Sequence, residues 1–121
     1  MLEMNPEIRG RWTAALRSGE YQQGRSALRK NDELCCLGVL CDLAVKAGVL
    51  TAMPGEDGHC WTYDGVPDYL PESVQEWAGL PQGNPLVTQP GRIDSEPLAI
   101  LNDQYNLDFA QIADAIDGGG S

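Results

Sequence analysis

The most regular alternation of hydrophobic and polar residues lies near the start of the chain. Its apolar residues recur at helical spacing and form one stripe: Ile8, Trp12, Ala15 and Leu16. Asn5 and Pro6 suit the N-cap and first turn of a helix, and Ser18-Gly19 is typical of a helix end. We therefore predict a helix between Asn5 and Gly19 that packs its stripe against the rest of the protein.

Residues 37–48, which overlap the most hydrophobic stretch of the chain, residues 34–45, also have helical spacing, but they are apolar on most sides. The residues that carry this pattern are Cys36, Val39, Leu40, Leu43, Val45 and Ala47. A helix that is apolar around most of its circumference is buried, because contact with water is unfavourable on every side. We predict a central helix that ends near Gly48, since glycine is common just after a helix.

Shorter patterns predict a small antiparallel sheet. Residues 26–29 and 34–36 flank Lys30-Asn31-Asp32, which suits a tight turn, so we expect them to form a hairpin. Residues 60–63 have the aromatic and β-branched side chains of a strand that joins this hairpin. The stretch 80–91 is rich in Pro, Gly and Gln and is expected to be irregular, with Leu86-Val87 extended.

Three further helices are predicted in the second half of the chain. Residues 71–79 begin with proline and glutamate and end with glycine, as short helices often do. Residues 95–103 form a second short helix that holds two leucines. Asp108 and Gln111 make a capping-box pattern for the last helix, whose apolar stripe is Phe109, Ile112, Ala113 and Ile116.

Together these elements predict an α+β fold with four to five short helices packed around a small antiparallel sheet. The length of 121 residues fits a single domain, which we expect to span residues 4–117. Residues 1–3 are interpreted as a vector scar and residues 118–121 as a flexible, linker-like tail. The expected core anchors are four large aromatic residues: Trp12, Trp61, Trp77 and Phe109.

Charge is divided unevenly along the chain. Residues 1–30 carry six cations and three acids, a charge of +3, whereas the rest carries two cations and 15 acids, a charge of −13. The net charge of −10 argues against direct binding to nucleic-acid phosphates, which would repel it. No apolar run approaches the roughly 18 residues of a membrane-spanning helix. The acidic majority has two explanations, an ordinary solvated surface or a face for a cationic partner.

The four cysteines are expected to be free. The N-terminus has no secretory signal, which predicts a reducing cytosol, and Cys35, Cys36 and Cys41 lie in the apolar stretch where thiols pack as small hydrophobes. A zinc site that adds His59 and Cys60 is an alternative, although adjacent ligands on regular structure point apart. A thiol-dependent enzyme that uses His59 is another, although buried thiols are poor nucleophiles. We expect no metal, no cofactor and no catalysis.

Two groups of polar residues are candidates for binding. The residues proposed for a partner surface are Asp42, Asn102 and Asp103. Their plainer explanations are a solvated helix face for Asp42 and the end of a helix for the other two. The residues proposed for an alternative ligand, a small phosphorylated nucleotide, are Arg25, Arg29 and Lys30, because guanidinium groups suit phosphate.

Several segments resemble a group of small proteins encoded by bacteriophages and prophages. These segments are residues 12–24, 35–43, 70–74, 98–103 and 109–114. The group has no assigned chemistry, so the resemblance transfers no catalytic residue. It implies a phage accessory protein in the cytosol of a bacterial host. We therefore expect a non-catalytic protein whose acidic surface engages a host protein, such as a defence protein, away from any membrane.

Overall fold

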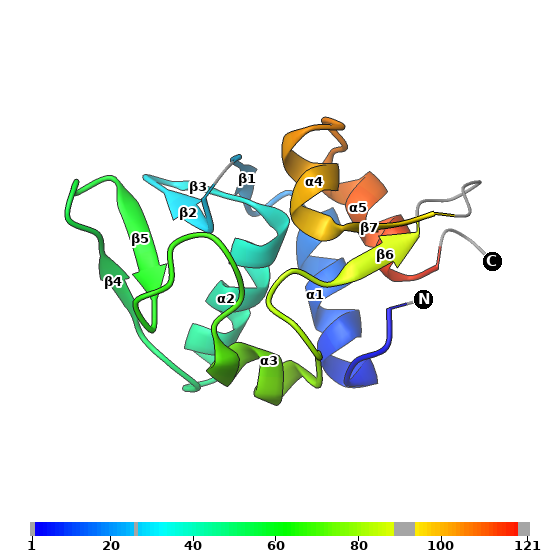
Figure 1. The fold of residues 1–121 in the computed structure, drawn as a ribbon, viewed down its shortest axis with the longest axis horizontal. Helices are drawn as coiled ribbons and strands as arrows, with labels where there is room; N and C mark the ends of the chain where they lie inside the picture. Colours follow the sequence, from blue (N-terminus) through cyan, green and yellow to red (C-terminus); the bar gives the residue numbers. More distant parts are fainter. Residues whose placement is uncertain (1, 26, 89–93, 119–121) are drawn as a thin grey trace.

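The helix α2 lies at the centre of the fold, with the five-stranded sheet on one side and α1, α4 and α5 on the other (Figure 1). This computed structural model describes residues 2–25, 27–88 and 94–118. The elements in chain order are α1 (Pro6–Ser18), β1 (Gln22–Gln23), β2 (Arg29–Lys30), β3 (Glu33–Leu34), α2 (Cys36–Lys46), β4 (Ala52–Pro54), β5 (Cys60–Tyr63), α3 (Glu72–Ala78), β6 (Leu86–Thr88), β7 (Ser95–Pro97), α4 (Leu98–Asp103) and α5 (Phe109–Ile116). In the described part of the chain, no helix is both long enough and apolar enough to cross a membrane.

The α+β fold is confirmed, but the larger sheet is mixed rather than antiparallel. Its strand order is β1-β3-β2-β5-β4, and β1 pairs with β3 in parallel. The predicted hairpin is present with shorter strands, β2 and β3, and Asn31 turns between them at a φ of 54°. The predicted strand β5 pairs with β2. The sequence did not reveal β1 and β4, because a Gln-Gln pair and a segment ending in Pro54 carry no strand pattern.

A separate two-stranded sheet leads into α4. β6 confirms the extended segment Leu86-Val87, but its partner β7 occupies residues that we predicted as the start of a helix. The helix starts only at Leu98, because Pro97 has an extended ψ of 140°. The Leu98 N–H then donates to the Pro85 carbonyl oxygen over 2.9 Å. The loop before β6 thus supplies an acceptor for an N–H group in the first turn of α4, which has no acceptor within the helix.

The predicted caps of the first and last helices are confirmed. Asn5 Oδ1 accepts hydrogen bonds from the N–H groups of Glu7 (3.0 Å) and Ile8 (3.2 Å), and a left-handed Gly19 ends α1. Asp108 and Gln111 form the capping box of α5. These two helices pack against each other. Local capping therefore determines where each helix begins, and the apolar faces hold the two helices together.

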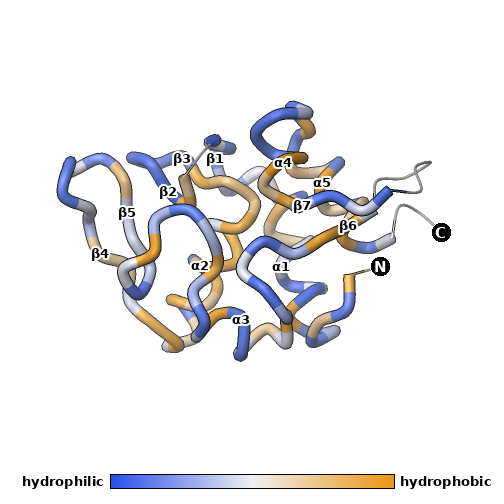
Figure 2. Tube along the Cα trace, in the orientation of Figure 1, coloured by the Kyte–Doolittle hydropathy of each residue, from blue (hydrophilic) through white to orange (hydrophobic). Residues whose placement is uncertain are grey.

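The hydrophobic core follows α2 and the elements that face it, whereas the loop tips are hydrophilic (Figure 2). Trp12 and Phe109 are buried as predicted. Trp61 and Trp77 are only partly buried and pack against the core from its edge. Tyr63, which is 1% exposed, is the fully buried aromatic residue of β5 instead.

Segments near the two ends of the described chain meet through a backbone hydrogen bond. Leu2 is 9% exposed, and its N–H donates to the Ile116 carbonyl oxygen over 2.9 Å. The segment interpreted as a vector scar therefore contributes Leu2 to the packed unit. At the other end, Gly118 donates to the Ala115 carbonyl oxygen over 3.2 Å, while the rest of the predicted tail and Met1 lie outside the described residues.

The side chain of Asn102, in α4, connects three parts of the fold. Its Oδ1 accepts hydrogen bonds from the Cys36 N–H (3.3 Å) and Gln23 Nε2 (2.9 Å), and its Nδ2 donates to the Gly24 carbonyl oxygen (2.8 Å). Cys35, the local N-cap residue of α2, makes no side-chain capping bond. Asn102 therefore supplies, from α4, the acceptor that the beginning of α2 needs.

A close backbone approach fixes α2 against the chain that leads into β2. A Cβ atom added to Gly38 would overlap the Leu28 carbonyl oxygen, which also accepts a hydrogen bond from the Cys35 N–H over 3.2 Å. Only glycine leaves room for this contact. By contrast, a Cβ atom added to Gly10 in α1 would meet nothing within 4 Å.

We predict that Asn102→Ala lowers the free energy of unfolding by about 2–4 kcal/mol, because it leaves the buried Gly24 carbonyl oxygen and Cys36 N–H without this partner and removes one of the two acceptors of Gln23 Nε2. Chemical denaturation monitored by circular dichroism measures this loss. The control is Gln104→Ala, an exposed position just after the same helix, where the change should stay within about 0.5 kcal/mol. Equal effects of the two substitutions would contradict the connecting role of Asn102.

We predict opposite effects for the same substitution in two helices. Gly38→Ala should destabilise the protein by about 1–3 kcal/mol, because its methyl group collides with backbone. Gly10→Ala should stabilise it by about 0.5–1 kcal/mol, because alanine favours the helix and has space there. Thermal or urea denaturation of both variants decides the matter, and a stabilised Gly38→Ala variant would refute the close approach.

Candidate functional site

The residues predicted for a partner surface are engaged mainly within the chain. Asn102 is 0% exposed and therefore does not belong to an exposed surface. Its side chain makes hydrogen bonds within the protein instead. Asp42 is partly buried, and its Oδ2 accepts hydrogen bonds from the Tyr21 hydroxyl (2.5 Å) and Lys46 Nζ (3.2 Å). Asp103 accepts a hydrogen bond from Asn102 Nδ2 over 2.8 Å. Asp42 thus ties Tyr21 to α2, and Asp103 supports the buried amide.

The three residues predicted to bind a phosphorylated ligand do not converge on one site. Arg29 and Lys30 are successive residues of β2, so their side chains leave opposite faces of the sheet. The Arg29 guanidinium lies over the ring of Trp61, 4.4 Å from its centroid, and Nε donates to the Asn31 carbonyl oxygen over 2.8 Å. Arg25 is exposed in the loop before β2. Arg29 is therefore engaged within the sheet rather than directed at a ligand beside Lys30.

The cysteines have the properties of packed, protonated thiols. All four are free, and Cys35, Cys36 and Cys41 are buried as predicted. Burial raises the pKa of Cys35 to about 11 and raises the pKa values of Cys36 and Cys41 well above the usual range. Cys60 is half-buried, and partial burial together with the Asp57 charge raises its pKa as well. Protonated thiols are weak nucleophiles and weak metal ligands at neutral pH.

The histidine lies apart from the three buried thiols. His59 is exposed in the loop between β4 and β5, and its Nδ1 is 3.3 Å from Asn31 Oδ1. Within residues 2–25, 27–88 and 94–118, no three His, Cys, Asp or Glu side chains are grouped so that they could hold a metal ion.

Cations of the N-terminal region are neutralised where α1 packs on α5. Arg17 forms ion pairs of 2.9 Å with both Asp114 and Asp117, and Arg9 Nε lies 3.9 Å from Asp117 Oδ1. Two of the six cations near the start of the chain are therefore compensated by acidic residues at the end of α5.

The longest stretch of acidic residues without any Lys or Arg lies in the middle of the chain. No Lys or Arg occurs between Lys46 and Arg92. This stretch contains six exposed acidic residues, which we call the acidic segment: Glu56, Asp57, Asp64, Asp68, Glu72 and Glu76. None of the six forms an ion pair with a cation of the described chain. The acidic segment thus presents carboxylates that can meet an external cation.

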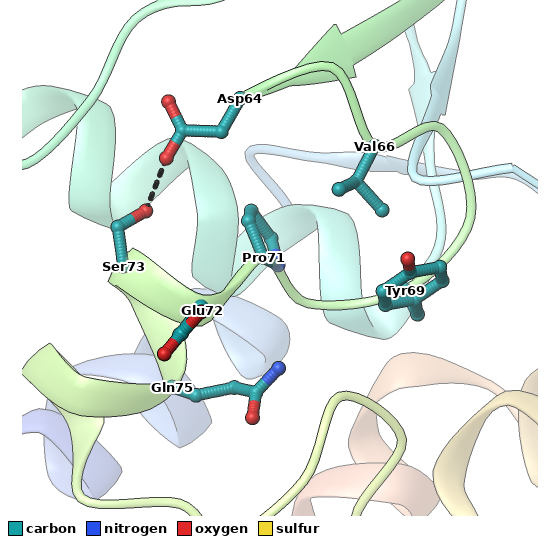
Figure 3. Close-up of a pocket in the computed structure, with 7 residues that line it drawn as sticks. All are labelled: Asp64, Val66, Tyr69, Pro71, Glu72, Ser73 and Gln75. Carbon is teal, nitrogen blue, oxygen red and sulfur yellow. Dashed lines mark hydrogen bonds between the residues drawn. The ribbon is translucent and has the colours of Figure 1, made fainter.

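A hollow of about 500 Å³ opens within the acidic segment, between the turn after β5 and α3 (Figure 3). Its lining residues are Asp64, Val66, Tyr69, Pro71, Glu72, Ser73 and Gln75. Asp64 and Gly65 form a two-residue turn with φ values of 52° and 79°, closed by 3.0 Å hydrogen bonds in both directions between Tyr63 and Val66. The Ser73 hydroxyl donates to Asp64 Oδ2 over 2.5 Å and so joins the turn to α3.

The wall opposite this hydrogen bond is the ring of Tyr69, which is 50% exposed. Its position depends on Gly83, because a Cβ atom there would lie 2.8 Å from Tyr69 Cδ2. The backbone is held at the same place, since the Leu70 N–H donates to the Gly83 carbonyl oxygen over 2.8 Å. Gln75 Nε2 donates to the Leu70 carbonyl oxygen over 2.7 Å. Tyr69 is therefore positioned by the loop that follows α3, and Gln75 by the main chain just before α3.

The polar atoms that the hollow offers to a ligand are mainly acceptors. Ser73 directs its hydroxyl proton at Asp64, and Gln75 directs its amide nitrogen at the main chain. Ionised carboxylates such as those of Asp64 and Glu72 only accept hydrogen bonds. The hollow therefore suits a cation with several N–H donors and disfavours an anion.

Reasoning from the sequence missed this site, although two signals for it were present. Asp64-Gly65 is a strong signal for a two-residue hairpin turn. The long stretch without Lys or Arg is also visible in the sequence. The contact between Tyr69 and Gly83 has no local signature, because it joins residues on either side of α3.

We predict that Cys60 is the cysteine that reacts with a thiol reagent in the native protein at pH 8. The three buried thiols should react only after unfolding, because they are both inaccessible and protonated. Counting the thiols modified by Ellman's reagent with and without denaturant measures this difference. Cys60→Ser should abolish the native reaction, and fast modification of a second thiol in the folded protein would contradict the described packing.

Comparisons with known proteins give one match. Residues 4–119 match the family described as "Domain of unknown function (DUF8296)". No curated protein and no solved structure matches the chain. Because the match covers almost the whole sequence, the chain belongs to the DUF8296 family.

Proposed function

We propose that this protein is a non-catalytic binding protein that engages a cationic partner protein through its acidic segment. The observation that supports this proposal is the set of six exposed carboxylates without a compensating cation, which lie in the β4–β5 loop, in the loop between β5 and α3, and on α3. Carboxylates without a compensating cation give their surface a negative potential, and that potential attracts a cationic partner.

The small free energy of each exposed ion pair means that binding depends on several carboxylates. One exposed ion pair contributes only about 0.2–1 kcal/mol, so several carboxylates have to act together. Charge complementarity of this kind increases the rate of association and selects among partners. The resemblance to phage and prophage proteins makes a protein of the bacterial host, for example a defence protein, the first partner to look for.

The proposal is tested by capture of partners from bacterial lysate at two salt concentrations with matched charge variants. The first variant combines Asp68→Asn, Glu72→Gln and Glu76→Gln in the acidic segment. The control combines Glu20→Gln, Glu33→Gln and Asp94→Asn, which are exposed positions elsewhere and change the net charge equally. We expect the first variant to lose at least about threefold in partner binding, since three pairs are removed, and the control to bind like the unmodified protein.

Salt provides the second criterion. Binding should weaken as salt rises, because exposed charges are screened within about 8 Å at physiological ionic strength. A partner that binds the acidic-segment variant as tightly as the unmodified protein would refute the proposal. So would equal losses for the two variants, because net charge alone would then account for binding.

A further inference from the structure

We infer that the hollow between the Asp64-Gly65 turn and α3 receives an arginine side chain of the partner protein. This inference rests on the proposed function and names the chemical group that the acidic segment recognises. It concerns one hollow with a defined lining, whereas the proposed function concerns the charge of the whole segment.

Hydrogen-bond polarity is the first argument. A guanidinium group has five N–H donors and no acceptor. The hollow presents the reverse arrangement, because Ser73 and Gln75 direct donors at Asp64 and at the Leu70 carbonyl oxygen. The carboxylates of Asp64 and Glu72 remain as acceptors on the lining (Figure 3). A guanidinium can therefore bind without leaving a donor opposed to another donor.

The aromatic wall is the second argument, and it favours arginine over lysine. The half-exposed ring of Tyr69 offers a face to a planar cation, and a guanidinium stacks on aromatic rings better than an ammonium group does. The described chain contains two cation–aromatic contacts, and the guanidinium one is the closer, since Lys46 Nζ lies 5.4 Å from the centroid of the Tyr21 ring. Arg29 lies over the ring of Trp61, 4.4 Å from its centroid, with Asp32 Oδ1 at 3.7 Å from its Nη2.

The shape of the hollow indicates a side chain presented by a macromolecule rather than a free small molecule. Sites for small molecules usually enclose most of the ligand surface. This hollow is open to solvent on the surface that also carries Asp68 and Glu76, which are exposed beside its lining. An arginine that projects from a protein can enter it while neighbouring basic residues meet these two carboxylates.

The test is a titration of the isotopically labelled protein with blocked tripeptides, followed by two-dimensional amide NMR. The probes are acetyl-Gly-Arg-Gly-amide and the matched peptides with citrulline or lysine in place of arginine. Citrulline keeps the shape of arginine and removes its charge. We expect the arginine peptide to shift the amide signals of Asp64, Tyr69 and Glu72 in a saturable manner, the lysine peptide to bind more weakly, and the citrulline peptide to cause no saturable shift.

Two single substitutions with the same charge change provide a matched comparison. Glu72→Gln should weaken binding of the arginine peptide by at least about threefold, whereas Glu20→Gln, at an exposed position outside the acidic segment, should change it by less than twofold. Their unperturbed amide spectra establish that both variants remain folded.

Several outcomes would overturn the inference. These are equal effects of the two substitutions, equal binding of the arginine and lysine peptides, saturable shifts with citrulline, or shifts that lie away from the hollow. Failure here is distinguishable from failure of the proposed function. If the arginine peptide misses the hollow while the triple acidic variant still loses its partner, the inference fails and the proposed function stands. If the triple variant keeps its partner, the proposed function fails.

Discussion

The capping of α2 by Asn102 is the interaction on which the rest of the structure depends. The first residue of α2, Cys36, donates its N–H to Asn102 Oδ1 over 3.3 Å and accepts a hydrogen bond from Trp12 Nε1 over 3.0 Å. Side chains from α4 and α1 thus fix the start of a helix that has no capping side chain of its own. Nδ2 of the same side chain donates to the Gly24 carbonyl oxygen, so the segment between β1 and β2 is held at this point as well.

The acidic segment gains its shape from this core. α2 contacts the backbone of Leu28 at Gly38, β2 pairs with β5, and β5 ends in the buried Tyr63 directly before the turn that carries Asp64. On the other side of the hollow, α3 is held by its buried residues and by the hydrogen bond of 2.8 Å from the Asn5 N–H to the Ala78 carbonyl oxygen. The carboxylates therefore stand on elements whose positions the core determines, which reduces the entropy lost when a partner binds.

The sequence predicted those parts of the structure that local patterns specify. The caps at Asn5 and Asp108, the buried thiols and the α+β class follow from neighbouring residues and their periodicity. The role of Asn102 did not, because its partners are distant in the chain and a polar residue at a helix end has the same sequence pattern whether it is exposed or buried. The parallel β1–β3 pair and the hollow were missed for the same reason, since both arise from contacts between separate segments.

The central claim is that the surface formed by residues 56–76, held in place by the core around α2, is the surface that binds a partner. Amide hydrogen exchange of the protein with and without its captured partner tests this claim most directly. The account predicts that the partner protects β5, the Asp64-Gly65 turn and α3, and leaves α1 and α5 unchanged. Protection confined to α1, α5 or the β1–β3 edge of the sheet would contradict it.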